Sequence, residues 1–421
     1  MAPVKKARPS AGAAPGQGDA AFPMRSVVIG VMLPALLFSI AVGVALPIIP
    51  TSATRLGADL ATAGFVAALL PLGKILADVP SGALASRIGD RNAMVLAAGL
   101  GLFAFVGAAT AQALWALQVS VLMLGVATAV FHLARHAYLT EVAPVDKRAR
   151  VLSTLGGMHR LGYLIGPFLG ALVIVSSSLG PAYWLASGCA LATLVVLVAA
   201  RPPAGERSRP AKASPPAPLL RIVGHHRRLL MTLGVATLLV GAMRGARQTV
   251  LPLWGEYLGL DPEVISLIFG LSGAFDVLLF YPAGKVMDSF GRLWIAVPSM
   301  LIMGVALAFL PLTDSVLTMS VAAGLLGLGN GLGSGIIMTV GADVAPPDGR
   351  SSFLGVWRLF QDTGDAAGPL IIVAGAALGS LAGGIWVAAS IGLLSSAALS
   401  RWVPRFSVHA NRTTRRRAGL G

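Results

Sequence analysis

The sequence is poor in charged residues and almost free of cysteine. Charged residues make up 12% of the 421 residues, against 56% hydrophobic ones, whereas a soluble protein carries about a quarter charged residues. The mean hydropathy is +0.80. The single cysteine, Cys189, excludes any disulfide within the chain. The shortage of charge argues against a soluble globular protein.

Motifs of catalysis are also missing. We find no His-Glu-x-x-His metal site, no Gly-x-Ser-x-Gly nucleophile elbow with partners and no Walker-type phosphate loop. We therefore expect no enzyme, no metal and no cofactor. Without a nucleotide site, the chain is not expected to be a self-contained ATP-driven pump. A gradient-driven carrier or a passive facilitator remains.

Long apolar runs dominate the rest of the chain. Each is about 18 residues or longer, which is enough to cross a bilayer as a helix, and backbone polar groups in lipid must be paired within the segment. We predict an all-α polytopic membrane protein whose partner is the lipid bilayer. Twelve transmembrane helices are expected, at 26–49, 60–84, 93–113, 117–140, 151–175, 182–200, 229–252, 262–286, 294–312, 317–341, 353–377 and 382–401.

The net charge of +15 is explained by this topology. With the N-terminus inside, most Lys and Arg fall in cytoplasmic segments, and Arg55 alone lies in an external loop, which follows the positive-inside rule. The cations are spread over many loops, so nucleic acid is not an expected partner. We predict a multi-pass protein of the cell membrane with both termini cytoplasmic, and the excess of Arg over Lys, with the many Ala and Gly, indicates a bacterial source. Six cations lie within helices and away from the helix ends: Lys74, Arg135, Arg160, Arg244, Arg247 and Arg358.

The chain repeats itself at an offset of 202 residues without a gap. EVAPVDKR (141–148) falls on DVAPPDGR (343–350), and RLGAD (55–59) falls on YLGLD (257–261). An even number of helices per repeat keeps both halves in the same orientation. The predicted order is a disordered basic cytoplasmic tail (1–25), a six-helix bundle (26–200), a Pro-rich cytoplasmic linker (201–228), a second six-helix bundle (229–401) and a basic cytoplasmic tail (402–421).

Two loops carry a further signature. GALASRIGDR (82–91) and GKVMDSFGR (284–292) resemble the Gly-x-x-x-Asp-x-x-Gly-Arg loop of the major facilitator superfamily. In that family the loop acid caps a helix of the other half and helps to hold the outward-open state. The resemblance gives this role to Asp288 in the second copy. In the first copy Ser86 stands in place of the acid and puts the role in doubt, because serine caps a helix without the charge–dipole contribution. The loop residues singled out are Gly82, Ser86, Gly89 and Arg91, with Gly284, Asp288, Gly291 and Arg292.

The fifth helix carries a glycine–proline element. GYLIGPFLGA (162–171) resembles the Gly-x-x-x-Gly-Pro-x-x-Gly-Gly element of drug–proton antiporters, with Ala171 in place of the last Gly. Small residues at this spacing also let helices approach closely. The presence of the same pattern in the eleventh helix favours packing as the shared cause. The element consists of Gly162, Gly166, Pro167 and Gly170, with Gly364, Gly368 and Pro369 in the second half.

Charges inside the membrane are costly and therefore point to function. The repeat makes Lys74 equivalent to Asp276, and Arg160 equivalent to Asp362. In the resembled fold the second helix faces the eleventh and the fifth faces the eighth. This predicts the pairs Lys74–Asp362 and Arg160–Asp276, which either tie the halves together statically or act as gates.

The charged residues on the same helices could also form ion pairs within one helix or carry a proton. Asp78 lies one turn from Lys74, and Arg358 one turn from Asp362, so each could be paired at i,i+4. Asp365 has no local partner and is a candidate proton carrier.

In the resembled fold, helices 1, 4, 7 and 10 line the central cavity. This adds Asn330 and the cluster FHLARHAY to the candidates for substrate binding, and histidine is a further candidate for proton coupling. Arg247 and His136 could instead reach toward the membrane surfaces. The candidates are His132, Arg135, His136, Arg244, Arg247, Gln248 and Asn330.

The sequence thus favours a monomeric secondary transporter that moves a small organic molecule by alternating access. Proton-coupled efflux is the first interpretation. The alternative is uptake or facilitated diffusion of a small organic anion, because three cavity arginines suit a negative or zwitterionic substrate. A channel and a non-transporting sensor are less consistent with an intact repeat and with ionisable residues inside both halves.

Overall fold

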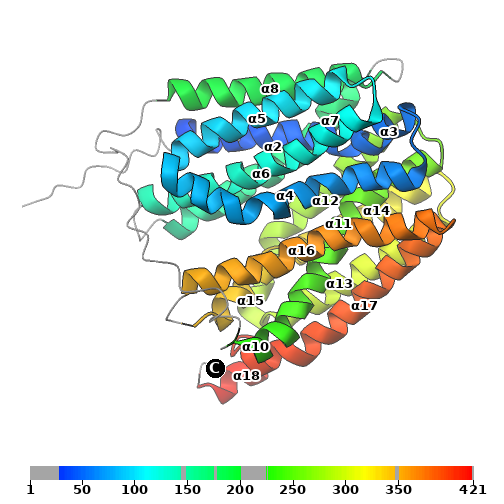
Figure 1. Cartoon of the computed structure of the whole chain (residues 1–421). Helices are drawn as coiled ribbons and strands as arrows, with labels where there is room; N and C mark the ends of the chain where they lie inside the picture. Colours follow the sequence, from blue (N-terminus) through cyan, green and yellow to red (C-terminus); the bar gives the residue numbers. More distant parts are fainter. Residues whose placement is uncertain are drawn as a thin grey trace, which may run out of the picture.

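The computed structural model describes residues 28–143, 148–174, 178–200, 224, 226–346 and 350–419. Within these ranges the chain is helical with short connections, and the long helices run roughly along one common direction (Figure 1). The predicted all-α polytopic fold is confirmed. The first 27 residues and nearly all of the predicted linker lie outside the described residues.

The two halves have matching element orders. The first contains η1 (Val28–Met32), α2 (Leu33–Ala45), η2 (Leu46–Ile48), α3 (Ile49–Arg55), α4 (Leu60–Ile88), α5 (Asp90–Thr110), α6 (Leu114–Val142), α7 (Arg148–Val173) and α8 (Gly180–Ala199). The second contains α10 (Arg227–Leu229), η3 (Leu230–Gly234), α11 (Val235–Tyr257), α12 (Pro262–Phe290), α13 (Leu293–Phe309), η4 (Leu310–Leu312), α14 (Val316–Leu332), α15 (Ile336–Val344), α16 (Arg350–Ala377), α17 (Leu381–Phe406) and α18 (Arg412–Arg417).

Ten stretches of the described residues are long and apolar enough to span a membrane. The sequence predicts twelve, and the two remaining helices, α7 and α16, are as long as the others. Interior charges lower their hydropathy: α7 carries Arg160, and α16 carries Arg358, Asp362 and Asp365. These two helices lie at the interface between the bundles, where α7 packs against α12 and α16 packs against α4.

Helix ends follow local chemistry. Asp59 caps α4 by accepting a hydrogen bond from the Thr62 backbone N–H at 2.8 Å, and hydrogen bonds from Thr62 lower the pKa of this carboxyl. Gly89 and Gly291 have φ of 84° and 107°, values that favour glycine. Each glycine separates two antiparallel helices, α4 from α5 and α12 from α13.

The tenth transmembrane segment is broken, whereas the sequence predicts one helix at 317–341. α14 ends at Leu332, α15 begins at Ile336, and Gly335 between them has φ of 76°. The break frees backbone carbonyls inside the bundle, where each needs a donor. Arg244 of α11 donates from Nη2 to the Gly333 carbonyl oxygen at 2.6 Å.

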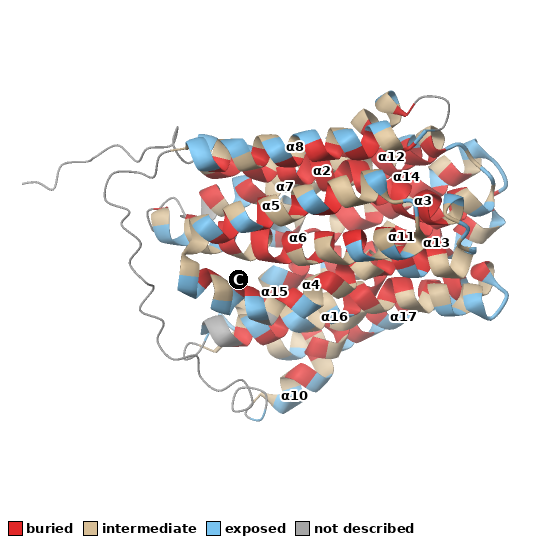
Figure 2. Ribbon diagram, turned by 45° about the horizontal axis from the view of Figure 1, so that its top comes forward, coloured by how far each residue is buried: buried red, intermediate tan, exposed pale blue. Residues whose placement is uncertain are grey.

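The bundles meet along two helix pairs. α4 packs against α16 and α7 packs against α12, so the neighbours implied by the family resemblance are confirmed. Buried residues concentrate where helices face one another, and exposed residues lie on outward faces (Figure 2). Large apolar side chains such as Phe103 (71% exposed) and Leu172 (78% exposed) lie on these outward faces, as expected for surfaces that contact lipid.

Glycines bring helices close within each half. A Cβ on Gly166 of α7 would lie 2.6 Å from the carbonyl carbon of Gly43 in α2, and Cβ atoms on Gly364 and Gly368 of α16 would meet the backbone of α11. Gly170 differs, since its nearest neighbour would be Val44 Cγ1 at 3.5 Å. The glycine–proline element therefore packs helices together in both halves.

Most of the predicted basic tail at 402–421 is described, and much of it is helical. Residues 402–406 extend α17, and Arg412–Arg417 form α18. The backbone N–H groups of Arg292 and Leu293 donate to the carbonyl oxygens of His409 (3.1 Å) and Ala410 (3.0 Å). The part of the tail at 407–417 is thus fixed against the loop between α12 and α13. Figure 1 shows α10, α15 and α18 at the same end of the molecule.

We name that end the inner end, because the charge distribution predicts that it faces the cytoplasm. The opposite end, which carries the α3–α4 and α11–α12 connections, is the outer end.

Candidate functional site

Lys74 joins the bundles to a different acid from the one predicted. Its Nζ lies 3.8 Å from Oδ2 of Asp365, and the two side chains are 18% and 17% exposed. The predicted partner, Asp362, contacts Arg358 instead. Asp365 lies three residues further along α16, nearly one helical turn, which places its carboxylate deeper in the protein than that of Asp362.

The local pairings differ between the two helices. Arg358 Nε lies 3.3 Å from Asp362 Oδ2, which is the expected i,i+4 pair. Asp78 does not form its expected contact with Lys74, because Lys74 is directed toward Asp365. Oδ2 of Asp78 is buried and finds no hydrogen-bond partner among the described residues.

Asp276 is the centre of the second contact between the bundles. Its Oδ1 accepts a hydrogen bond from Arg160 Nη1 of α7 at 2.7 Å, so the predicted pair is present. Its Oδ2 accepts from Asn330 Nδ2 of α14 at 2.8 Å and lies 3.8 Å from Arg247 Nη2. Arg247 also donates to Ser272 Oγ at 3.0 Å. Arg247 is therefore held inside the second half rather than extended toward the outer surface.

A polar cluster lies inside the first half. The rings of His132 and His159 meet edge to face at 4.8 Å, and that of His159 lies 4.4 Å from Tyr163. Ser39 Oγ and His159 Nδ1 are 2.9 Å apart. Arg135, on the same helix as His132, is 2% exposed. His136 is exposed and its Nδ1 lies 2.8 Å from the His132 carbonyl oxygen, so it is outside the cluster.

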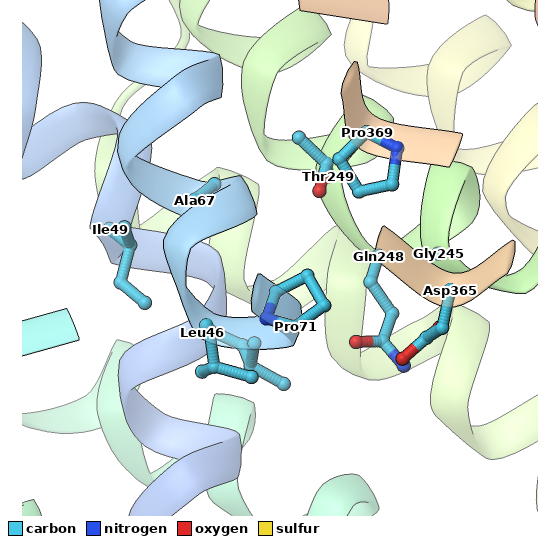
Figure 3. A pocket seen from close by; sticks show the side chains of 10 residues that line it. Leu46, Ile49, Ala67, Pro71, Gly245, Gln248, Thr249, Asp365 and Pro369 are labelled. Atoms are coloured by element: carbon cyan, nitrogen blue, oxygen red, sulfur yellow. The ribbon is translucent and has the colours of Figure 1, made fainter. Parts of the chain in front are cut away.

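A small pocket lies between the halves on the outer side of Lys74. Its wall comes from the first transmembrane helix, α4, α11 and α16, and includes Leu46, Ile49, Ala67, Leu70, Pro71, Gly245, Gln248, Thr249, Asp365 and Pro369. Figure 3 shows the side chains of Gln248 and Asp365 next to each other at one edge, with apolar side chains opposite. Asp365 therefore lies between this pocket and the amine of Lys74.

The outer end is closed by direct contact between the halves. Thr54 Oγ1 of α3 donates to Glu256 Oε1 of α11 at 2.9 Å. α11 also packs against η2 and α3, the outer part of the first transmembrane helix.

The two family-type loops hold their own halves together in this conformation. Arg91 donates to the carbonyl oxygens of Leu197 (2.8 Å) and Ala200 (2.6 Å) at the end of α8. Arg292 pairs with Asp343 at 3.1 Å and with Asp288 at 3.4 Å.

In the described part of the chain, the acid positions of the loops contact their own half. The Asp288 side chain is 77% exposed and lies 3.4 Å from Arg292, and Ser86 Oγ donates to the Ala83 carbonyl of its own helix. The cap expected from Asp288 at the start of α7 falls on residues 144–147, which lie outside the described residues. Gly82 and Gly284 have open space around them.

Several site residues were missed by the sequence. Thr54, Glu256, His159 and Tyr163 are not among the candidates that the sequence indicates. The 202-residue offset contains a usable signal: it places Thr54 on Glu256 and Tyr163 on Asp365. Polar residues at equivalent positions, near an axis between two halves, are candidates for contact across that axis.

The fold and site define a class of protein: a polytopic membrane carrier made of two repeated six-helix bundles with ion pairs between them. The family comparison agrees. The profile of the Major Facilitator Superfamily matches residues 31–245 and 233–419. The chain therefore belongs to the major facilitator superfamily.

A curated relative supports this assignment, and a solved structure shows the same fold. The chain is 30% identical over 363 residues to the uncharacterized MFS-type transporter YdeG of Bacillus subtilis, covering 81% of this chain and 80% of that protein. It is 23% identical over 345 residues to the quinolone resistance protein NorA of Staphylococcus aureus, covering 80% and 86%. A crystal structure of a POT family transporter in complex with a thioalcohol-conjugated peptide superposes with a TM-score of 0.76 at 13% identity, covering 91% and 97%.

Proposed function

We propose that this carrier exports a small organic molecule from the cytoplasm and that the export is coupled to protons. The observation that carries the proposal is the position of Asp365. Its carboxylate lines the pocket between the halves and also forms the ion pair with Lys74 of the opposite bundle. Protonation of Asp365 removes the negative charge of that pair, so occupancy by a proton changes the energy of the contact between the bundles.

The proposed cycle rocks the two bundles about the site. The outer contact between Thr54 and Glu256 is closed here, so this state precedes outward opening in the proposed cycle. Opening outward requires this contact to break and the family-type loops at the inner end to dock against the opposite half. The resemblance to a quinolone resistance protein supports export as the direction.

The test is transport by purified protein in proteoliposomes that contain a pH-sensitive dye, under an imposed proton gradient. Adding a quinolone should cause proton movement in the wild type, and Asp365→Asn should abolish it. Asp314→Asn, which neutralises an exposed acid at the outer end, should leave it unchanged. Proton movement of wild-type size in Asp365→Asn would contradict the coupling role.

A second candidate is uptake or facilitated diffusion of a small organic anion. It is favoured by the charges in the interior of the helices, away from the helix ends, where six cations and four carboxylates lie. In the same liposomes, flux of an organic acid without a response to quinolone would favour this candidate. The cations are Lys74, Arg135, Arg160, Arg244, Arg247 and Arg358, and the carboxylates are Asp78, Asp276, Asp362 and Asp365.

A further inference from the structure

Arg135 is a buried guanidinium with unused hydrogen-bond donors. The residue is 2% exposed, and its Nε and Nη1 atoms are buried without a hydrogen-bond partner among the described residues. A buried charge is stable only when it is paired or bonded. The other interior arginines are better satisfied: Arg160 and Arg247 contact Asp276, and Arg244 bonds the Gly333 carbonyl.

Among the described residues, no carboxylate acts on Arg135; the groups that do are Tyr163 of α7 and the cation Arg358 of α16. The ring of Phe131 lies 5.9 Å from its guanidinium carbon. A second cation nearby makes an unpaired Arg135 less stable still.

The surroundings are aromatic. His132 and His159 stand edge to face at 4.8 Å, His159 lies 4.4 Å from Tyr163, and Phe131 stacks on Phe38 at 4.4 Å. Aromatic rings favour offset or edge-on contact with another ring. The planar fork of a guanidinium matches a carboxylate or another oxyanion with two parallel hydrogen bonds.

We propose that Arg135 binds the acidic group of an aromatic acid, with the ring of that acid placed among His132, His159 and Tyr163. The proposal rests on the carrier function above and adds to it the chemical class of the cargo and the residue that recognises it. His136, one turn from His132 toward the inner end, is exposed, which makes the inner end the proposed side of entry.

Equilibrium binding to purified protein in detergent tests the proposal without transport. The probes share one ring and differ in the attached group: benzoate, benzenesulfonate and phenylphosphonate, with neutral benzamide as reference. At least one anion should bind more tightly than benzamide. Arg135→Gln should weaken that anion by roughly ten- to a hundredfold and leave benzamide unaffected.

Two further variants sharpen the result. Arg135→Lys keeps the charge but loses the fork, and should lie between wild type and Arg135→Gln. Arg228→Gln removes one positive charge from an exposed position at the inner end and should bind like wild type. Thermal denaturation of each variant, followed with a thiol-reactive dye on Cys189, shows whether it is folded.

Equal affinity for the anions in wild type and in folded Arg135→Gln would overturn the proposal, as would anions that bind no better than benzamide. The outcome is separable from that of the transport test. Quinolone-driven proton movement without anion binding would contradict the acid site at Arg135 but remain consistent with efflux. If the anions bind to the wild type but not to Arg135→Gln, and quinolone causes no proton movement, the acid site is supported and quinolone–proton antiport is contradicted.

Discussion

Thr54 and Glu256 occupy equivalent positions of the two halves and bond to each other, with Thr54 Oγ1 2.9 Å from Glu256 Oε1. Equivalent residues of a two-fold repeat meet only near the axis that relates them. The bond therefore lies on the pseudo-two-fold axis, at the outer end. It joins the bundles where an outward-opening motion must separate them.

Removing this bond should favour the outward-open state. A hydrogen bond to a charged group contributes about 1.5–3 kcal/mol, so Thr54→Val should raise the ratio of open to closed outer ends by roughly tenfold or more. With Cys189 replaced by Ala and a cysteine introduced at Gln248 in the pocket, labelling by an impermeant maleimide from outside should accelerate. Ser320→Ala, which removes an exposed hydroxyl bonded within its own helix, should not change the rate. An unchanged rate in Thr54→Val would show that packing alone closes this end.

The pair of Lys74 and Asp365 should tolerate exchange of its charges. Breaking a buried ion pair costs about 3–5 kcal/mol, so Lys74→Asp and Asp365→Lys should each lose transport. The double variant should recover a measurable part of the flux, although not coupling that requires Asp365 at its own position. Lys74→Asp with Asp362→Lys is the matched control and should stay inactive, because Asp362 contacts Arg358. Recovery by that control instead would support the partner predicted from sequence.

Asp276 should matter more to stability than its neutral neighbour Asn330. Asp276→Asn leaves Arg160 and Arg247 without their carboxylate, an effect of about 3 kcal/mol or more. Asn330→Ala removes one hydrogen bond, or about 1 kcal/mol. Thermal denaturation of the purified variants, followed through Cys189, should rank them in that order. The reverse order would show that the ion pair adds little to the contact between α7 and α12.

Two alanine variants distinguish a packing role of the glycine–proline element from a role in the transport cycle. A Cβ at Gly166 would lie 2.6 Å from Gly43 of α2, whereas a Cβ at Gly170 would make ordinary contact with Val44 at 3.5 Å. Gly166→Ala should lower stability by about 1–3 kcal/mol through overpacking, and Gly170→Ala should be tolerated. A stable but inactive Gly166→Ala would favour a role in the transport cycle over packing.

Chain-wide regularities could be predicted from the sequence. The hydropathy runs determined that the chain is a bundle of long helices, because lipid leaves the backbone no other way to pair its polar groups. The 202-residue offset determined two halves in one orientation, and the sign pattern of Lys74, Arg160, Asp276 and Asp362 indicated that charges meet between them. The Arg160–Asp276 contact follows from these regularities together with the helix neighbours that the family resemblance implies.

Details that depend on fractions of a helical turn came only from the tertiary structure. The choice of Asp365 over Asp362 depends on the depth and rotation of α16 against α4, which a residue count along one helix does not contain. The same holds for the break before Gly335, which is stabilised by Arg244 from another helix. The unused donors Nε and Nη1 of Arg135 became visible only from the described side chains around it, because a hydrogen-bond partner is a property of packing. Sequence determined which charges enter the membrane, and tertiary structure decided which of them are neutralised there.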